Sequence, residues 1–230
     1  MSVTEWDTDQ ELQMAIALSR LLHPTSISFR NAARILYNDD GTVKHAVPPD
    51  MLGVDPDAWL AQKDTNRDWL IKGELEELKK LLQAKSSTAL PARLNRALWY
   101  HEYASRTYYG HLRWILVCTA VESLLNTGKD DCSRQFRERL HELANFVGLG
   151  IDKEEAKTAY ATRSQLAHGG ATSKLNDAEE HLYLKLESIL AAALKRSITD
   201  VNFAKIFKDE GSIRSQWPIM QKKKGCLLST

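Results

Sequence analysis

The sequence predicts an all-α protein, a helical bundle with an additional helical N-terminal region, and three observations carry this prediction. Apolar residues recur at intervals of three and four in almost every periodic segment, which is the spacing of a helix face. No βαβ alternation and no glycine-rich phosphate loop is present. The 230 residues, 43% hydrophobic and 27% charged, suffice for one large domain or for a domain with a sizeable extension.

Two helical segments are expected before a turn-rich stretch. Asp7 and Gln10 have the spacing of a helix cap, and Pro24 ends the helix that follows them. A second helical segment is predicted over about residues 28–37. The following stretch, residues 38–49, contains Asn-Asp-Asp-Gly and a Pro-Pro pair, so we expect it to be irregular and exposed.

A third N-terminal helix is predicted over about residues 64–84, with Gly73 as its weak point. The small polar residues of 85–91, which end in proline, favour a linker. We therefore expect a helical extension at residues 1–90, a helical domain at 91–200, and a C-terminal helix with a basic tail at 201–230.

The central domain has the clearest helix signals. Helices are predicted over about residues 92–103, 107–126, 133–146, 152–168 and 177–195. Asp152 and Glu155 have the spacing of a capping box, and Gly169-Gly170 is a typical helix stop.

Charge and cysteine content exclude several classes. The formal net charge of +1 argues against a protein that binds nucleic acid through its overall charge, so RNA would have to bind a local patch. Three scattered cysteines indicate neither a disulfide framework nor a zinc site. No signal peptide and no apolar run of membrane-spanning length is recognisable, so we expect a cytoplasmic protein without a membrane partner.

An arginine followed by a histidine five positions later is the pattern of most chemical interest. It occurs three times, so spacing alone does not select a site. The three pairs are Arg96 and His101, Arg106 and His111, and Arg163 and His168. The first pair lies within a continuous helical pattern, where residues five apart differ by about 140° of rotation, so we interpret both as belonging to solvated helix faces.

The second pair flanks two tyrosines near a predicted helix start. Arg106, Tyr108, Tyr109 and His111 could line an RNA groove, because aromatic rings stack on bases and cations bind phosphates.

The third pair differs because two glycines follow His168 directly. A helix that ends there could let this histidine leave the regular helical angle and converge with Arg163. A helix C-terminus also favours a protonated imidazole. Histidine can then take the proton from a ribose 2′-hydroxyl, and arginine can stabilise the charged phosphorane. The alternative is that His168 simply caps the helix.

Several segments together resemble one known family. Residues 160–169 (YATRSQLAHG) are similar to the Arg-to-His signature of HEPN domains, particularly the Apea-like HEPN group. Residues 119–125 (TAVESLL) resemble that group's helix with alanine, an aliphatic residue and glutamate, and residues 134–140 its intervening basic helix. Residues 93–102 resemble the helix that precedes them. The resemblance covers about residues 92–195.

This resemblance implies a HEPN-type bundle that forms a homodimer, with two Arg-to-His motifs meeting in a cleft. It implies metal-independent endoribonuclease activity with no cofactor, leaving a 2′,3′-cyclic phosphate. Arg163 and His168 match the catalytic positions. Glu122 matches an acidic position that can orient Arg163, although an exposed helix carboxylate is an equal interpretation. Ser164 stands where many members carry Asn, Asp or His, and is a supporting residue.

Three functional hypotheses remain. The first is a ribonuclease, a toxin or phage-defence effector with RNA as substrate and a regulatory protein or antitoxin as a further partner. The second is a non-catalytic HEPN module that serves as an interaction or RNA-binding scaffold. The third, a helical transcription regulator, would use the basic face of Arg134, Arg137 and Arg139, but acidic residues surround it.

Overall fold

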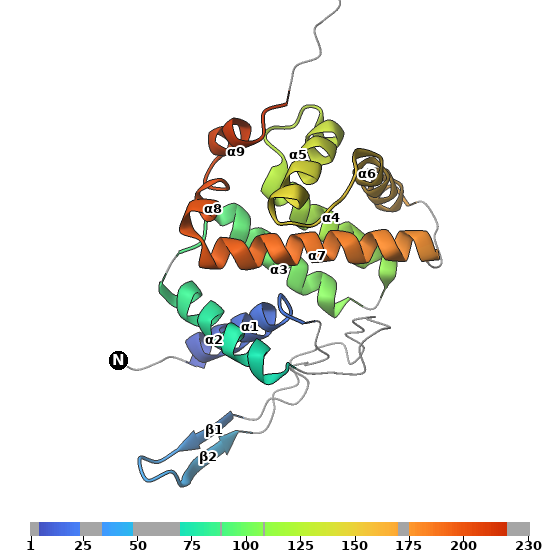
Figure 1. The fold of residues 1–230 in the computed structure, drawn as a ribbon. Helices are drawn as coiled ribbons and strands as arrows, with labels where there is room; N and C mark the ends of the chain where they lie inside the picture. Colours follow the sequence, from blue (N-terminus) through green and yellow to red (C-terminus); the bar gives the residue numbers. More distant parts are fainter. Residues whose placement is uncertain are drawn as a thin grey trace, which may run out of the picture.

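The computed structural model describes residues 5–23, 34–47, 70–87, 89–107, 109–169 and 175–219. Its described part is helical apart from one short hairpin, so the predicted all-α class is confirmed (Figure 1). The elements are α1 (Glu5–Ser19), β1 (Arg34–Tyr37), β2 (Val43–Val47), α2 (Lys72–Ser87), α3 (Ala92–Arg106), α4 (Gly110–Leu125), α5 (Cys132–Phe146), α6 (Lys153–Ala167), α7 (Asp177–Thr199), α8 (Val201–Lys205) and α9 (Glu210–Gln216).

Helix α7 crosses the middle of the molecule and separates two groups of helices (Figure 1). Helices α3 and α4 pack closely against each other and both contact α7. On one side of this centre lie α5 and α6, which pack on each other and on α4; on the opposite side lie α1 and α2. The helix that carries Arg163 is therefore on the side away from the N-terminal helices.

One hydrophobic core runs through the described helices. Its centre is the inward face of α4, where Trp114, Val117 and Val121 have no exposed surface. Leu18 of α1 and Phe207, which follows α8, belong to the same core. Residues from all three predicted segments thus bury apolar surface together, which is the main favourable term in folding.

Helix ends follow the sequence signals where a side chain caps the first turn. The capping box of Asp152 and Glu155 at the start of α6 is confirmed, with both reciprocal hydrogen bonds present. Asn176 and Glu179 form a second box at the start of α7, which the sequence analysis did not identify. Helix α7 also continues four residues past its predicted end, to Thr199.

The predicted second helix, residues 28–37, is wrong over its final part. Residues 24–33 lie outside the described residues, but Arg34–Tyr37 form strand β1, which pairs antiparallel with β2. The turn between them is closed by the Asn38 N–H donating to the Thr42 carbonyl, with Gly41 at φ +82°. The Asn-Asp-Asp-Gly stretch, predicted as part of an irregular loop, instead forms the turn of a hairpin, which such a stretch between β-forming residues favours.

The predicted helix at 64–84 begins later than expected. Residues 64–69 lie outside the described residues, Leu70 and Ile71 are not helical, and α2 begins at Lys72. Gly73 therefore lies in the first turn of α2 rather than weakening its interior. The predicted linker begins within α2, because Ser86 and Ser87 donate hydrogen bonds back to carbonyls of the helix. None of the described helices combines the length and apolar character needed to cross a membrane.

Candidate functional site

Helix α6 carries both residues of the Arg163 and His168 pair. The capping box fixes its first turn, and His168 is its C-terminal cap residue. Gly169 follows at φ +81°, a left-handed conformation that glycine adopts without steric cost. The His168 N–H still makes the helical hydrogen bond to the Ser164 carbonyl at 3.2 Å, and the left-handed Gly169 then ends the helix.

Helix α4 holds α6 in register through a column of side chains one turn apart. The Trp114 indole Nε1 donates a hydrogen bond to the Ala159 carbonyl at 3.1 Å, and Cys118 lies beside the same carbonyl. Glu122 lies one turn after Cys118 on α4, and Arg163 lies one turn after Ala159 on α6; the Arg163 Nη2 donates to the Glu122 Oε2 at 2.9 Å. The buried indole contact thus fixes the position of α6 along α4 at which Arg163 meets Glu122.

The Glu122 and Arg163 pair is partly accessible. The Glu122 side chain is 15% exposed and the Arg163 side chain 27% exposed. Burial raises the pKa of Glu122, and the charge and hydrogen bond of Arg163 oppose that rise. Arg163 has no second hydrogen-bond acceptor among the described residues, and its Nε is buried without a partner. Because the side chain is partly exposed, the remaining Nη donors can bind an anion that approaches α6, whereas the buried Nε cannot.

The side chains of His168 and Arg163 do not interact within one chain, although the sequence predicted that they could converge. The backbone of His168 leaves the helical region, with φ −96° and ψ 15°, but this change does not bring its side chain into an interaction with Arg163. No hydrogen bond, ion pair or ring contact joins their side chains, and the His168 side chain is exposed. Ser164 is half-buried, and its hydroxyl makes no hydrogen bond to any described residue. Within one chain, Arg163 lies in α6 and His168 at its C-terminal cap, with no polar or ring interaction between the two side chains.

The second predicted group is only partly assembled. Tyr109 is 58% exposed, and its ring lies 5.6 Å from that of His111. Arg106, by contrast, turns back along its own helix and pairs with Glu102 at 2.6 Å. Tyr108 lies outside the described residues. The structure therefore brings two of the four residues together and engages Arg106 elsewhere.

The interpretation of His101 as part of a solvated face is wrong. Arg96 is exposed, but His101 is 1% exposed and its neighbour Glu102 has no exposed surface. The Arg20 Nη1, in the turn that directly follows α1, lies 2.6 Å from the Glu102 Oε1, which also accepts from Arg106. Arg96 and His101 do lie on different faces of α3, as their spacing predicted. The face that carries His101 is covered by α1 and α7, so His101 lies in the core.

Burial shifts the titration of the groups around His101. It lowers the pKa of His101 to about 4, and the charge of Arg20 adds to this effect. It raises the pKa of Glu187 on α7 to about 7, although Arg113 and Tyr183 oppose the rise. The His101 Nε2 and the Glu187 Oε1 are 4.0 Å apart, so this cluster belongs to the interior rather than to an accessible site.

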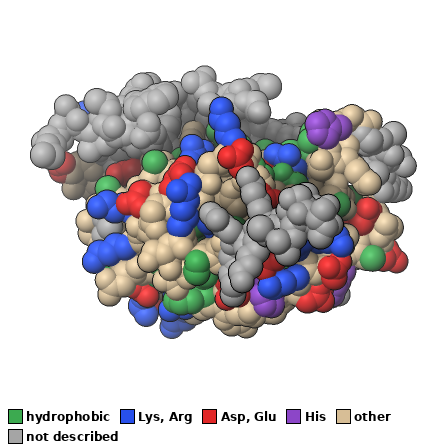
Figure 2. All heavy atoms as spheres, turned by 90° about the horizontal axis from the view of Figure 1, so that it is seen from above, with side chains coloured by type: hydrophobic (Ala, Val, Ile, Leu, Met, Phe, Trp, Pro, Cys, Tyr) green, Lys and Arg blue, Asp and Glu red, His purple; other side chains and the backbone are tan. Residues whose placement is uncertain are grey.

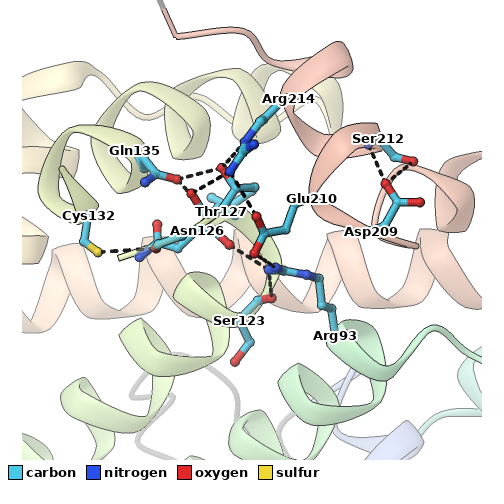
Figure 3. Close-up of polar contacts among 12 residues, drawn as sticks. Arg93, Ser123, Asn126, Thr127, Cys132, Gln135, Asp209, Glu210, Ser212 and Arg214 are labelled. Carbon is cyan, nitrogen blue, oxygen red and sulfur yellow. Dashed lines mark hydrogen bonds and ion pairs between the residues drawn. The ribbon is translucent and has the colours of Figure 1, made fainter. Parts of the chain in front are cut away.

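Three arginines meet at the C-terminal end of α4, directly after the turn that carries Glu122. They are Arg93, Arg139 and Arg214, and Figure 3 shows Arg93 and Arg214 pointing toward this end with Glu210 between them. Arg139 is 3% exposed, so it does not contribute to the basic face suggested by the sequence. Their hydrogen bonds go from Arg93 to the carbonyls of Ser123 and Asn126, from Arg139 to the carbonyls of Leu125 and Trp217, and from Arg214 to Thr127.

These arginines satisfy carbonyl groups that lack partners at a helix end, and their charge is favourable at the negative end of α4. Their meeting point was not predictable, because several of their acceptors are backbone carbonyls and the side-chain acceptors Thr127 and Glu210 are separated from them by long stretches of sequence or give no distinct pattern. Their effect on the candidate site is indirect, since they fix the last turn of α4 and with it Glu122.

The surface and the comparisons add no further site. Figure 2 shows the face above α5, α6 and α9, where basic and acidic side chains are interspersed rather than separated into large areas of one charge. Among the described residues, no group of three or more His, Cys, Asp or Glu side chains could hold a metal ion. Comparisons with protein-family models, with curated proteins and with solved structures find no match.

Proposed function

We propose that this protein is a metal-independent endoribonuclease of HEPN type that cleaves RNA at a site formed between two protomers. The observation that supports the proposal most is the ion pair between Glu122 and Arg163. Glu122 holds one donor of the guanidinium and leaves other donors available. An exposed histidine, His168, follows five residues later at the C-terminal cap of the same helix. An arginine in this state can bind and neutralise a phosphate.

The proposed reaction needs only the two side chains. His168 takes the proton from a ribose 2′-hydroxyl, the 2′-oxygen attacks the adjacent phosphorus, and the bond to the 5′-oxygen of the next nucleotide breaks. Arg163 stabilises the negative charge of the phosphorane. The proton that His168 has taken is returned to the departing 5′-oxygen, directly or through water, so the products are a 2′,3′-cyclic phosphate and a 5′-hydroxyl end and the histidine is neutral again.

A homodimer explains how residues that do not touch within one chain could act together. In a two-fold arrangement the same surface of each protomer meets its copy, so His168 of one protomer can approach Arg163 of the other. Tyr109 and His111 would then contribute to RNA binding outside the reacting centre. In the cell, such an enzyme acts in the cytoplasm as a toxin or phage-defence effector and needs a regulatory protein or antitoxin.

The test is cleavage of a labelled single-stranded RNA by the purified full chain, with and without EDTA. We expect equal cleavage in both, a cyclic phosphate at the new end, and loss of cleavage in Arg163→Ala and His168→Ala variants that remain folded and dimeric by light scattering. Absence of cleavage by the parent protein, or unchanged cleavage by the His168→Ala variant, contradicts the proposal.

A non-catalytic scaffold is the second candidate, and one observation favours it. The Arg163 and Glu122 pair joins α6 to α4 and is itself a structural contact. A scaffold that depends on this pair predicts that Arg163→Ala lowers the free energy of unfolding by about 1 kcal/mol or more, because Glu122 loses its partner, whereas His168→Ala changes stability little, because the exposed His168 side chain has no hydrogen-bond partner among the described residues. It also predicts that the parent protein cuts no RNA, whereas the ribonuclease predicts cleavage that both variants lose. Thermal melts and cleavage assays of both variants separate the two.

A further inference from the structure

The guanidinium of Arg163 is incompletely held by its carboxylate partner. A single hydrogen bond, from Nη2 to Glu122, leaves the planar group free to turn about that contact. A bidentate pair would prevent this rotation, but Nε is buried and has no acceptor. Something other than hydrogen bonding must hold Arg163 if its free donors are to face a ligand in a defined direction.

Tyr160 lies where it can supply that contact. It precedes Arg163 by three residues on α6, and side chains at this spacing are neighbours on a helix face. The Arg163 Cζ lies 6.0 Å from the centre of the Tyr160 ring, at the outer limit of a cation–π contact. The guanidinium therefore has a carboxylate from α4 and an aromatic ring from its own helix as neighbours.

The Tyr160 ring is itself supported. Its centre is 5.3 Å from that of Phe136, a residue of α5 with no exposed surface, and the two rings are inclined by 56°. Such inclined pairs are favourable because the edge of one ring meets the face of the other. Phe136, Tyr160 and Arg163 thus form a continuous contact from the core to the candidate site.

The hydroxyl of Tyr160 has no comparable role. It makes no hydrogen bond to any described residue, whereas the ring contacts both neighbours. Burial raises the pKa of Tyr160, and the nearby Glu122 carboxylate raises it further, so the hydroxyl stays neutral at physiological pH. The contribution of this residue to Arg163 therefore comes from its ring.

We propose that Tyr160 is a positioning residue for Arg163: its ring, backed by Phe136, holds the guanidinium against Glu122 so that the remaining donors face the RNA phosphate. The direction toward a phosphate rests on the proposed function. The restraint on Arg163 does not, so the two parts can be tested separately.

The restraint is tested by NMR on the ¹⁵N-labelled full chain, through the Nε–H signal of Arg163, which is assigned by its loss in an Arg163→Lys variant. In Tyr160→Leu we expect this signal to move toward the position of an unstructured arginine and its hydrogen exchange to accelerate by about two- to thirtyfold, the range of a cation–π contact. In Tyr160→Phe we expect neither change. Tyr103→Leu, which alters an exposed tyrosine of α3, is the control and should leave the signal unchanged.

An unchanged signal in Tyr160→Leu overturns the proposal, as does a Tyr160→Phe variant that changes as much as Tyr160→Leu, since the hydroxyl would then be the essential group. The consequence for RNA is measured by kcat and KM of the same variants, with Tyr160→Phe restoring the cleavage that Tyr160→Leu loses. If the parent protein cuts no RNA, the proposed function fails while the NMR result still decides the role of Tyr160.

Discussion

Two of the arginine–glutamate pairs that join distant parts of this chain differ in burial and in the donors that they leave accessible. Arg20, in the turn directly after α1, pairs with Glu102 of α3, and the two side chains are only 1% and 0% exposed. Arg163 and Glu122 connect α6 to α4 and are 27% and 15% exposed. A fully buried pair loses its hydration and must be satisfied within the protein, whereas a partly exposed pair keeps donors for an external ligand. The buried pair thus links Arg20 to α3 within the core, whereas the partly exposed pair links α6 to α4 and leaves Arg163 donors accessible to a ligand.

The largest difference between the pairs is expected in stability. Glu102→Gln removes the carboxylate that Arg20 shares with Arg106, and breaking a buried pair costs about 3 to 5 kcal/mol of unfolding free energy. Denaturant unfolding of the variant measures this loss. The double variant Arg20→Met with Glu102→Leu should regain part of it, because apolar side chains need no counter-charge. A loss no greater than that of Glu122→Gln would erase the distinction between the two pairs.

The second prediction concerns two buried titratable groups near this pair, His101 and Glu187. The pH dependence of stability tests how strongly burial shifts their pKa values. The pKa of Glu187 is raised by burial from 4.5 to about 7, so its folded form keeps a proton that the unfolded chain releases, and stability falls as pH rises through this range. The pKa of His101 is lowered by burial from 6.5 to about 4, so stability rises with pH over an overlapping range.

These opposing slopes predict the behaviour of a Glu187→Gln variant. Removing the carboxyl leaves the rising contribution of His101 alone. The gain in unfolding free energy from pH 4.5 to 6.5 should therefore exceed that of the parent by on the order of 2 to 3 kcal/mol. Urea unfolding at both pH values measures the difference, and parallel pH profiles for parent and variant would contradict it.

A smaller effect is expected at the end of α6, beyond the accessible pair. Gly169 has φ +81°, and a Cβ at this position would meet no atom within 4 Å. Gly169→Ala therefore introduces only backbone strain, about 1 kcal/mol of unfolding free energy. Gly41→Ala, at φ +82° in the hairpin turn and equally uncrowded, is a matched control for left-handed strain away from the site. Amide exchange should show fraying near His168 only in the Gly169 variant.

The smallest effect on stability is expected from the accessible pair itself. Glu122→Gln keeps a hydrogen-bond acceptor beside Arg163 and removes a charge that is partly solvated, so we expect a loss below about 1 kcal/mol. RNA cleavage should nevertheless fall, because a neutral amide orients the guanidinium less firmly. A Glu122→Gln variant with full cleavage would show that Glu122 serves packing alone.

The sequence predicted local structure far better than long-range contacts. The capping box of Asp152 and Glu155 and the glycine stop at Gly169 are short-range signals, and both lie where they were expected. The hairpin was missed because four residues cannot display a helical or an alternating period clearly, and the Asn-Asp-Asp-Gly turn was the better signal.

The sequence predicted which residues belong to the candidate site, but not which of their side chains are in contact. Glu122 and Arg163 were selected by resemblance, and the ion pair between them is present. Burial of His101 and Glu102 was not predictable, because Arg20 lies 82 residues before Glu102 and no pattern in either segment links them. The separation of Arg163 from His168, which share no hydrogen bond, ion pair or ring contact, was not predictable either, because α6 ends at Ala167 and the sequence does not fix the conformation of the cap residue His168.

That separation makes a subunit-mixing experiment the most direct test of the central claim. Arg163→Ala and His168→Ala variants, each inactive alone, are unfolded, mixed in equal amounts and refolded, and RNA cleavage is measured in EDTA. If His168 of one protomer acts with Arg163 of the other, half of the dimers are mixed and each has one intact pair, so about a quarter of the parent activity should return. A mixture as inactive as its two components would contradict the account.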